Sequence, residues 1–316
     1  MYFIVTTVIT FFCKPLGVAV LSYIYGWPYK VWITYAILLL LWLLVTPSTY
    51  STFKVNGRQW KKDVIVITGG SNGLGLELAE QCASKGAKVV SLDICPRKID
   101  NVISYICDVS DEHQVEETFE KIRKDVGDPT VLINNAAVVS GKHIQDLHAA
   151  DLRKTFETNL FSSIYTINQC ITSMKEKKFG NIVHISSSTA HVAPAQTFDY
   201  SASKAGILCL HDCLLAELGG YNQPVTVLLV TLGQMATKLF EGVKTPSPFF
   251  APIIGPEEIA ASIVLGIGVN QGGEVAFPLY ARWVGVLRLL PASINRILRY
   301  LSGADLGMKT FKQTRG

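Results

Sequence analysis

Short apolar runs alternate with amphipathic stretches from residue 61 to residue 280. The runs at 63–68 (DVIVIT) and 88–93 (KVVSLD), for example, have the pattern of buried strands, and a segment with helical periodicity lies between them. Strands that are apolar on both faces and separated by helices are typical of a parallel sheet covered on each side. The pattern predicts an α/β fold with a doubly wound parallel sheet of the Rossmann type.

The same periodicity gives the individual elements. The predicted strands are 63–68, 88–93, 102–108, 130–135, 180–188, 224–231 and 274–278, and the predicted helices are 74–86, 112–127, a long helix at 151–175, one that opens at 200, and 255–267. Because no internal repeat or long polar linker divides these elements, we expect a single domain over 61–280.

The first fifty residues differ from the rest because they are almost wholly apolar. Residues 31–46 carry no charge, and Trp27, Tyr29 and Trp32 stand at their leading edge, where an aromatic belt would lie. A helix that crosses a bilayer needs roughly 20 apolar residues, so tilt or flanking residues must complete the span.

We therefore expect residues 1–50 to be a membrane anchor with one or two hydrophobic segments, which Lys14 and Pro15 would separate. No convincing small-residue cleavage site follows, so the anchor should stay uncleaved. A buried core helix is the alternative, and it would need complete protein cover. The bases that follow the run place the body in the cytosol, and a hairpin with both ends in the cytosol stays open.

Charge divides the chain into three parts. Residues 1–60 hold four bases and no acid, residues 61–280 hold 18 bases and 24 acids, and residues 281–316 hold seven bases and one acid. Because the basic ends are interleaved with apolar residues and the body has no basic excess, we expect a membrane surface as partner and no nucleic acid. The basic amphipathic C-terminal segment, 281–316, would lie in the membrane interface or form a dimer-packing helix.

Cysteines and histidines give no metal site. The seven cysteines are scattered without a CxxC spacing, which indicates a reducing compartment and no zinc. We interpret Cys209 and Cys213, one helical turn apart, as small core residues. His184 and His191 have neither an acid partner nor a nucleophile elbow, so we expect them to be structural or to line a pocket.

A glycine-rich turn, ITGGSNGLGLELA (67–79), follows the first predicted strand and opens the first helix. Gly69, Gly73 and Gly75 allow a tight turn and a close backbone approach, and the helix N-terminus offers unpaired N–H groups to a pyrophosphate. The turn between strand and helix predicts a dinucleotide site.

Asp93 ends the next predicted strand, eighteen residues beyond Gly75. A carboxylate there can accept hydrogen bonds from the ribose diol and would repel a 2′-phosphate, which favours NAD over NADP. The neighbouring Arg97 and Lys98 keep NADP open, and Asp93 is alternatively a turn residue at a strand end.

These residues, together with others in order along the chain, resemble a classical short-chain dehydrogenase/reductase. The resemblance rests on TGGSNGLG (68–75), Asp108, NNAA (134–137), Asn159, Ser187 and YSASK (200–204). They span nearly all of 63–240 with the family's order and spacing. The resemblance implies an enzyme that acts on CH–OH groups with NAD or NADP as acceptor.

The spacing of Tyr200 and Lys204, i and i+4, places both on one helix face. An ammonium beside a phenol favours the phenolate, so we expect Lys204 to lower the pKa of Tyr200 from about 10 and let it exchange a proton with the substrate. Ser187, thirteen residues before the tyrosine, would hydrogen-bond the substrate oxygen and stabilise its charge.

The resemblance also implies roles for further residues. Lys204 would hold the nicotinamide ribose, and Asn159 would position a water that relays protons. Asp108 and Asn135 would contact the adenine side and the sheet centre, and Thr237 would anchor its loop toward the nicotinamide amide. The cofactor-binding residues expected are Gly69, Ser71, Asn72, Gly73, Leu74, Gly75, Asp93, Asp108, Asn135, Tyr200, Lys204 and Thr237. Relatives dimerise through the helices expected at 151–175 and 200–218, which implies a homodimer.

Two positions depart from the family pattern. Ala137 stands in place of a glycine and should crowd the cofactor slightly, and Leu232-Gly233 replaces a proline-glycine pair, which should loosen the loop that Thr237 anchors. Neither change removes a reacting group.

The segment 237–258 occupies the place of the family's variable, substrate-covering segment. Its apolar residues would form a lid over a lipophilic substrate or pack on the domain; they are Phe240, Phe249, Phe250, Ile253 and Ile254.

The anchor, Asp93 and the basic tail together resemble the branch of microsomal retinol and 17-beta-hydroxysteroid dehydrogenases found on the endoplasmic reticulum and lipid droplets. The expected function is hydride transfer between NAD(H) and a lipophilic alcohol or carbonyl of the sterol, retinoid or long-chain lipid type, in a domain that faces the cytosol. The alternatives are an NADPH-dependent reductase of a keto-sphingoid base or acyl-dihydroxyacetone phosphate, and a non-catalytic nucleotide-binding scaffold on lipid droplets.

Overall fold

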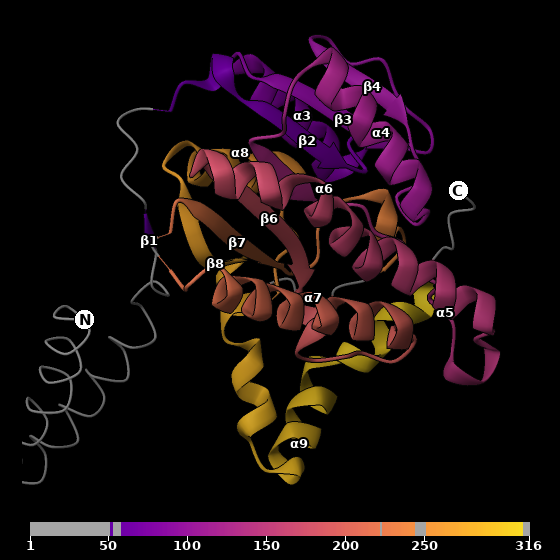
Figure 1. Ribbon diagram of the computed structural model, residues 1–316. Helices are drawn as coiled ribbons and strands as arrows, with labels where there is room; N and C mark the ends of the chain where they lie inside the picture. The colour runs from indigo at the N-terminus through magenta and orange to yellow at the C-terminus, as the bar shows by residue number, and fades with distance from the viewer. Residues whose placement is uncertain (1–50, 53–57, 222, 244–250, 312–316) are drawn as a thin grey trace, which may run out of the picture. The chain divides into compact units, whose positions relative to one another are not determined.

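The computed structural model describes residues 51–52, 58–221, 223–243 and 251–311 (Figure 1). The chain divides into two units, Met1–Ser48 and Thr49–Gly316, and all described residues belong to the second. The predicted anchor over 1–50 lies outside the described residues. Among the residues that the structure does describe, no helix has both the length and the apolar character to cross a bilayer.

The second unit is built on an eight-stranded sheet. Its strands are β1 (Ser51–Thr52), β2 (Val64–Thr68), β3 (Lys88–Asp93), β4 (Val102–Ile106), β5 (Val131–Asn134), β6 (Gly180–Ser187), β7 (Val225–Leu232) and β8 (Gln271–Phe277). They lie in the order β1-β8-β7-β6-β5-β2-β3-β4. Only the β1–β8 pair is antiparallel among these strands. The predicted parallel α/β sheet is confirmed, and the strand order reverses at β2, between β3 and β5.

Helices cover both faces of this sheet (Figure 1). On one face lie α3 (Gly73–Ser84) and α8 (Pro256–Gly268), and on the other α4 (Glu112–Asp125), α6 (Ser162–Lys177) and α7 (Phe198–Glu217). Two further helices, α5 (Ala149–Phe156) and α9 (Ala292–Ser302), contribute no residue to either core cluster. Side chains alternate along each strand, so in β2 Ile65 and Ile67 are buried with α3 and α8, whereas Val64 and Val66 are buried with α4 and α6. Both strand faces are apolar because both are covered.

A buried ion pair fixes the start of β2. Arg58 Nε donates to Asp63 Oδ2 at 2.8 Å, and the two side chains are only 2% and 3% exposed. Arg58 Nη1 also donates to the carbonyl oxygen of Ile267 at 2.8 Å, at the end of α8. The pair therefore ties the first parallel strand to the helix above it.

The long helix predicted at 151–175 is divided in the structure. A π-helical turn, Glu157–Phe161, separates α5 from α6. Such turns commonly occur at functional sites, and this one contains the buried Asn159. The helical periodicity of the sequence continues through both helices and does not reveal the extra residue in the turn.

The interpretation of Cys209 and Cys213 as core residues is wrong. Both thiols are exposed on α7. The buried face of α7 carries Ile207, His211 and Leu214 instead, so the two cysteines lie on the outer face.

The C-terminal segment packs on the loop that follows β6. The 3₁₀ helix Val284–Leu289 and α9 form a hairpin that projects from the rest of this unit (Figure 1). Arg288 donates to the carbonyl oxygens of Ala190 and His191 at 3.0 and 2.7 Å. Arg299 donates to the carbonyl oxygen of Ala193 at 2.9 Å. Two of the arginines expected at a membrane or dimer surface thus hold the hairpin to its own chain.

Candidate active site

A cavity of about 2030 Å³ lies at the carboxyl ends of the parallel strands. The turns that follow β2, β3, β5, β6 and β7 all contribute to its wall. Doubly wound sheets bind their ligands at this edge, next to the point where the strand order reverses. Because pockets for one small ligand measure roughly 300–1,000 Å³, this cavity has room for a dinucleotide and a second molecule.

The glycine turn closes so tightly that a side chain does not fit. Gly69 and Gly73 have φ values of +64° and +53°, in the region that glycine adopts without strain. A Cβ atom on Gly75 would lie 2.1 Å from the carbonyl oxygen of Gly69 and 2.7 Å from Asn135 Nδ2. Gly69, Gly73, Asn72 and Leu74 line the cavity. Since α3 begins at Gly73, its first N–H groups can receive an anion there.

Two other residues predicted to bind the cofactor, Ser71 and Gly75, do not line the cavity. Ser71 is fully buried; its N–H donates to Asp93 Oδ2 at 3.1 Å, and its Oγ accepts from the N–H of Arg97 at 3.2 Å. Both residues therefore support the shape of the glycine turn without facing the cavity, and Ser71 joins the turn to the end of β3.

Asp93 and Arg97 border the cavity together. Asp93 Oδ1 accepts from the N–H of Cys95 at 3.0 Å, so both carboxylate oxygens hold backbone N–H groups of turns. Each oxygen keeps a lone pair for a ribose hydroxyl. The two roles considered for Asp93, turn residue and ribose ligand, are therefore compatible in one side-chain position.

Asp108 and Asn135 also line the cavity, each fixed by local hydrogen bonds. Asp108 Oδ1 accepts from the N–H and the hydroxyl of Ser110 at 3.0 and 2.6 Å. Asn135 Nδ2 donates to the carbonyl oxygens of Thr68 and Gly69 at 2.9 and 3.1 Å. Asn135 thus fastens the turn after β5 to the glycine turn.

Ser187, Tyr200 and Lys204 come together in the same cavity, and all three are nearly fully buried. Lys204 Nζ donates to the carbonyl oxygen of Ile185 at 2.8 Å. Ser186 Oγ donates to the carbonyl oxygen of Lys204 at 3.2 Å. These bonds hold α7 against the end of β6, and Lys204 Nζ lies 5.8 Å from the centre of the Tyr200 ring.

The expected lowering of the Tyr200 pKa is not found in the protein alone. Burial raises the pKa of Tyr200 to about 12, and the side-chain interaction with Ser187 opposes this. Burial also lowers the pKa of Lys204 to about 8. The prediction considered the attraction between ammonium and phenolate but not the desolvation of both charges, which dominates here.

Ser187 is well placed to donate a hydrogen bond. Its Oγ accepts from the N–H and the hydroxyl of Thr189 at 3.2 and 3.0 Å. Because the oxygen accepts these two bonds, its own proton is left to donate, either to Tyr200, whose pKa this interaction lowers, or to a substrate oxygen. Thr189 also lines the cavity, and no pattern in the sequence indicated it.

Asn159 does not line the cavity. Its Oδ1 accepts from the N–H of Val138 at 2.8 Å, and its Nδ2 donates to the Val138 carbonyl oxygen at 2.9 Å and to Ser203 Oγ at 3.0 Å. Both amide protons are used, so the side chain positions the loop after β5. Val138 itself lines the cavity. The predicted water relay stays a prediction.

The loop after β7 begins with a hydrogen bond to the end of β8. The N–H of Gly233 donates to the carbonyl oxygen of Phe277 at 2.7 Å, and a Cβ atom on Gly233 would lie 2.4 Å from Tyr280 Oη. The loosening expected from Leu232-Gly233 stays a prediction. Thr237 reaches the glycine turn, since its Cγ2 would lie 3.3 Å from a Cβ atom on Gly73. Ala137 lines the cavity.

The predicted lid has mixed outcomes. Phe240 lines the cavity and meets the Tyr200 ring edge-on, with 5.2 Å between ring centres. Ile254 packs on the core, as the packing alternative predicts. Ile253 is exposed, so it follows neither alternative. Phe249 and Phe250 lie outside the described residues.

His184 and His191 do not line the cavity. His184 is fully buried on β6 beside His211, with ring centres 6.3 Å apart. Burial lowers the pKa of His184 to about 3. His191 packs against Gly285. Of the two expectations for these residues, the structural one holds.

The apolar wall of the cavity was not predicted from the sequence. This wall comes from the C-terminal segment and consists of Trp283, Val284, Leu287, Leu298, Leu301, Met308 and Phe311. A Cβ atom on Gly141 would lie 2.3 Å from the Phe311 ring, so the tail also closes against the loop after β5. Its only sequence signal is an amphipathic pattern, which does not say what the apolar face covers.

Comparison with known proteins agrees with this geometry. The family model for short chain dehydrogenases matches residues 63–247. The chain is 32% identical over 255 residues to the uncharacterized oxidoreductase TDA5 of Saccharomyces cerevisiae, with 78% of each chain covered. This chain belongs to the short-chain dehydrogenase family. It is thus an oxidoreductase of CH–OH groups that uses NAD or NADP.

Other relatives support the branch that the sequence resembles. The chain is 29% identical over 287 residues to human short-chain dehydrogenase/reductase 3, covering 86% of this chain and 94% of that protein. It is 29% identical to mouse epidermal retinol dehydrogenase 2, covering 66% and 72%. A solved short-chain dehydrogenase from Streptomyces avermitilis has the same fold, with a TM-score of 0.62, 23% identity and coverage of 79% and 99%.

Proposed function

We propose that this short-chain dehydrogenase transfers a hydride between NAD(H) and a lipophilic alcohol or carbonyl of the sterol, retinoid or long-chain lipid type. The observation that carries the proposal is that Tyr200 and Ser187 share one cavity with the apolar C-terminal wall, including Trp283, Leu287 and Phe311. Binding sites match the polarity of their ligands, so a mostly apolar molecule fits next to the proton-exchanging pair. The retinol dehydrogenase name of one relative is consistent with this class.

The residues suggest how the chain would handle the proton. Because burial raises the pKa of Tyr200 to about 12, the phenol is protonated at neutral pH and can give its proton to a carbonyl oxygen during reduction. Ser187 would donate a hydrogen bond to the same oxygen as negative charge develops. Alcohol oxidation needs the reverse transfer, and Lys204 would assist it by favouring the phenolate. When bound, the nicotinamide supplies or accepts the hydride.

The residues present fit a nicotinamide dinucleotide. The backbone around Gly75 leaves no room for a Cβ atom, so this tight turn requires glycine. The first turn of α3 lines the cavity, where its N–H groups would bind the pyrophosphate. Lys204 would hold the nicotinamide ribose. Asp93 supports NAD, because its carboxylate would repel a 2′-phosphate. Arg97 borders the same cavity and supports NADP as the alternative.

The proposal includes a membrane setting. The uncharged run at 31–46 supports an anchor within residues 1–50, on the endoplasmic reticulum or lipid droplets, with the catalytic domain facing the cytosol. We also propose a homodimer through the outer faces of α6 and α7, where Ile164 and Phe198 are exposed. Detergent-extracted protein run on a sizing column would reveal a single copy if this is wrong.

The test is a substrate panel. The detergent-solubilised full chain is mixed with NAD and sterols, retinol or long-chain alcohols, and the absorbance of the reduced cofactor is followed. Turnover that Tyr200→Phe abolishes supports the proposal. Turnover confined to NADPH with keto-sphingoid bases or acyl-dihydroxyacetone phosphate favours the reductase alternative. Cofactor binding without any turnover, and a cellular effect that survives Tyr200→Phe, favours the scaffold.

A further inference from the structure

We infer that the hairpin of Val284–Leu289 and α9, called here the docking hairpin, seats on an anionic lipid surface and holds the mouth of the cavity against it. The inference rests on the proposed function, because it gives a lipophilic substrate a route to Tyr200 that avoids water. It is carried by the apolar face, the charge and the fastening of this hairpin.

The apolar face of α9 runs from inside the cavity to the outside of the molecule. Ile294, Ile297, Leu298 and Leu301 are spaced i, i+3, i+4 and i+7, so they share one side of the helix. Leu298 and Leu301 line the cavity and are also 37% and 73% exposed, and Ile294 and Ile297 are 44% and 56% exposed. An apolar molecule that moves along this face stays in contact with hydrocarbon side chains throughout.

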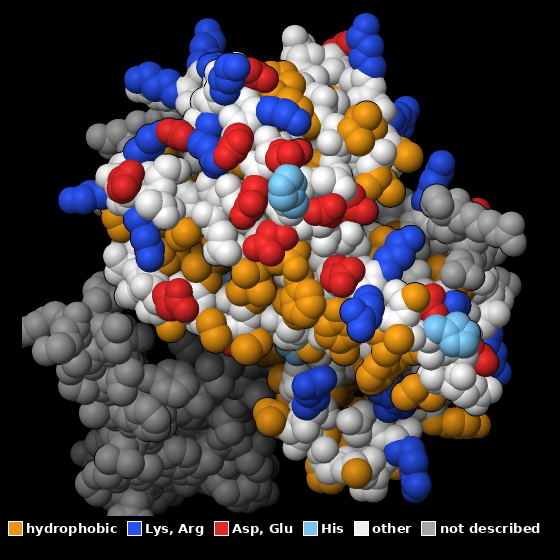
Figure 2. Space-filling view, turned by 45° about the vertical axis from the view of Figure 1, so that its right-hand side comes forward, with side chains coloured by type: hydrophobic (Ala, Val, Ile, Leu, Met, Phe, Trp, Pro, Cys, Tyr) orange, Lys and Arg blue, Asp and Glu red, His pale blue; other side chains and the backbone are white. Residues whose placement is uncertain are grey.

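The tip of the docking hairpin is also apolar, since Leu289 is 83% exposed. Figure 2 shows hydrophobic and basic side chains gathered on the projecting lower part of the molecule, whereas acidic and basic side chains are interspersed on the upper part. Contiguous exposed apolar side chains on a folded domain mark a contact surface.

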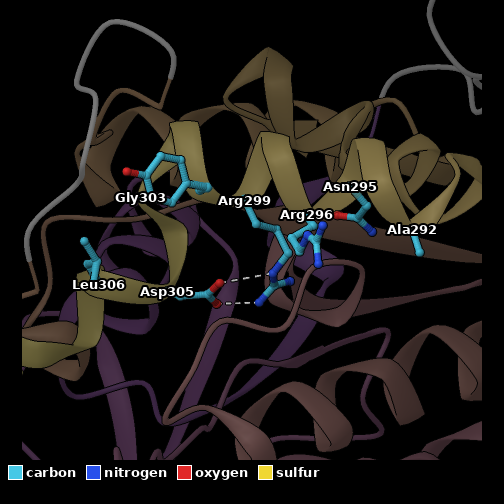
Figure 3. A pocket seen from close by; sticks show the side chains of 8 residues that line it. Ala292, Asn295, Arg296, Arg299, Gly303, Asp305 and Leu306 are labelled. Atoms are coloured by element: carbon cyan, nitrogen blue, oxygen red, sulfur yellow. Dashed lines mark hydrogen bonds and ion pairs between the residues drawn. The ribbon is translucent and has the colours of Figure 1, made fainter.

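The charge of this region is of one sign. Residues 279–302 contain four arginines and no acid. Arg296 and Arg299 border a hollow of about 530 Å³ together with Asn295 and Tyr300 (Figure 3). Asp305 pairs with Arg299 across this hollow, whereas Arg296 is exposed and makes no ion pair with any residue that the structure describes. Arg296 is thus available to a lipid phosphate.

Charge distinguishes between the possible binding partners of the docking hairpin. A second copy of the docking hairpin would bring its three arginines, Arg288, Arg296 and Arg299, against the same three, and the neighbouring acid, Asp305, already pairs with Arg299. Residues 1–50 of the same chain carry Lys14 and Lys30 and also no acid. An anionic lipid surface offers both the apolar interior and the negative charge that an apolar helix with an arginine-bearing polar side binds.

The docking hairpin is fastened well enough to transmit this contact to the cavity. Arg288 and Arg299 are bonded to the backbone of the loop 190–193, and that loop follows the strand that ends at Ser187. Lipid that holds the docking hairpin therefore also holds the apolar wall of the cavity that contains Ser187 and Tyr200.

The experiment maps lipid contact directly. The full chain is reconstituted into phosphatidylcholine vesicles with or without phosphatidylserine, each with a trace of a photoactivatable diazirine phospholipid, and the labelled peptides are located by mass spectrometry. We expect labelling of residues 284–302 that phosphatidylserine increases. Leu289→Gln with Ile297→Gln should lower this labelling roughly tenfold. Arg296→Gln should lower it about fivefold, and only in vesicles with phosphatidylserine.

The matched control is Leu265→Gln, because Leu265 is 71% exposed on α8, away from the hairpin; it should leave the labelling unchanged. Unlabelled 284–302 in vesicles where residues 1–50 are labelled would overturn the inference. Cross-links from the hairpin to a second copy or to residues 1–50, without lipid labelling, would also overturn it. Turnover of the panel of sterols, retinol and long-chain alcohols in detergent separates the two proposals. Turnover without labelling removes docking alone, and labelling without turnover of any panel member removes the proposed function alone.

Discussion

The substitution Gly75→Ala should abolish tight cofactor binding while the protein stays folded. The added Cβ atom would lie 2.1 Å from the carbonyl oxygen of Gly69. Because a carbon and a carbonyl oxygen approach to about 3.3 Å in favourable contacts, the turn must open by about 1 Å. Backbone carries this contact on both sides, so no side-chain rotation relieves it.

The cost to binding follows from that displacement. Hydrogen bonds to a phosphate weaken steeply when their donors move about 1 Å from the optimum. Two lost bonds to a charged group are worth about 3–6 kcal/mol of binding free energy, whereas the better helix propensity of alanine adds up to about 1 kcal/mol to folding stability and does not enter binding. The Kd for NADH should therefore rise about 100-fold or more, with a stability loss of about 1–3 kcal/mol from overpacking.

Isothermal titration of detergent-solubilised protein with NADH measures this Kd, and the Tm shows whether the variant is folded. Gly255→Ala is the control, because a Cβ atom there meets nothing within 4 Å, and its Kd should equal that of the wild type. Wild-type affinity in a folded Gly75→Ala variant would refute the assignment of this turn to the pyrophosphate.

Three further predictions concern stability and cofactor choice. Arg58→Met removes the ion-pair partner of the buried Asp63 carboxylate and should lower the free energy of unfolding, measured in urea, by about 3–5 kcal/mol. The control Lys177→Met removes one partner of an exposed ion pair and should lower it by less than about 1 kcal/mol. Equal losses would contradict the role of burial. Burial lowers the pKa of His184 to about 3, so the unfolded chain binds a proton that the folded chain does not. The free energy of unfolding should therefore fall as the pH drops from about 6.5 towards 3, by up to about 1.4 kcal/mol per pH unit; His184→Leu should flatten that slope, and an unchanged slope would show another group to be responsible. Asp93→Ala should reduce the ratio of NAD to NADP affinity and leave the pH profile of turnover unchanged, and a preserved ratio would remove Asp93 from cofactor choice.

The strands and the site's reacting residues were predictable because each depends on local pattern. The run 88–93 is β3 to the residue, since six consecutive positions fit a strand covered on both faces. Ser187 and Tyr200 come together because parallel strands end at the same edge of the sheet, and short connections leave little freedom in where the next helix begins.

What could not be predicted depends on contacts between distant segments. The π-helical turn at Glu157–Phe161 contains Asn159, whose hydrogen bonds to Val138 join it to a segment 21 residues earlier in the chain. The pKa of Tyr200 depends on how completely the surrounding elements bury it. The apolar wall depends on the packing of Phe311 against Gly141. An amphipathic pattern predicts that a helix has an apolar face, but not which segment that face contacts.

The most direct test of the proton-transfer assignment is the single-turnover rate of Tyr200→Phe, measured with NAD and an alcohol that the wild type oxidises. The substitution keeps the ring and its edge contact with Phe240 and removes only the hydroxyl. We expect the hydride-transfer rate to fall by about 10²–10⁴ while the Kd for NADH stays at the wild-type value. A wild-type rate in this variant would show that another group exchanges the proton.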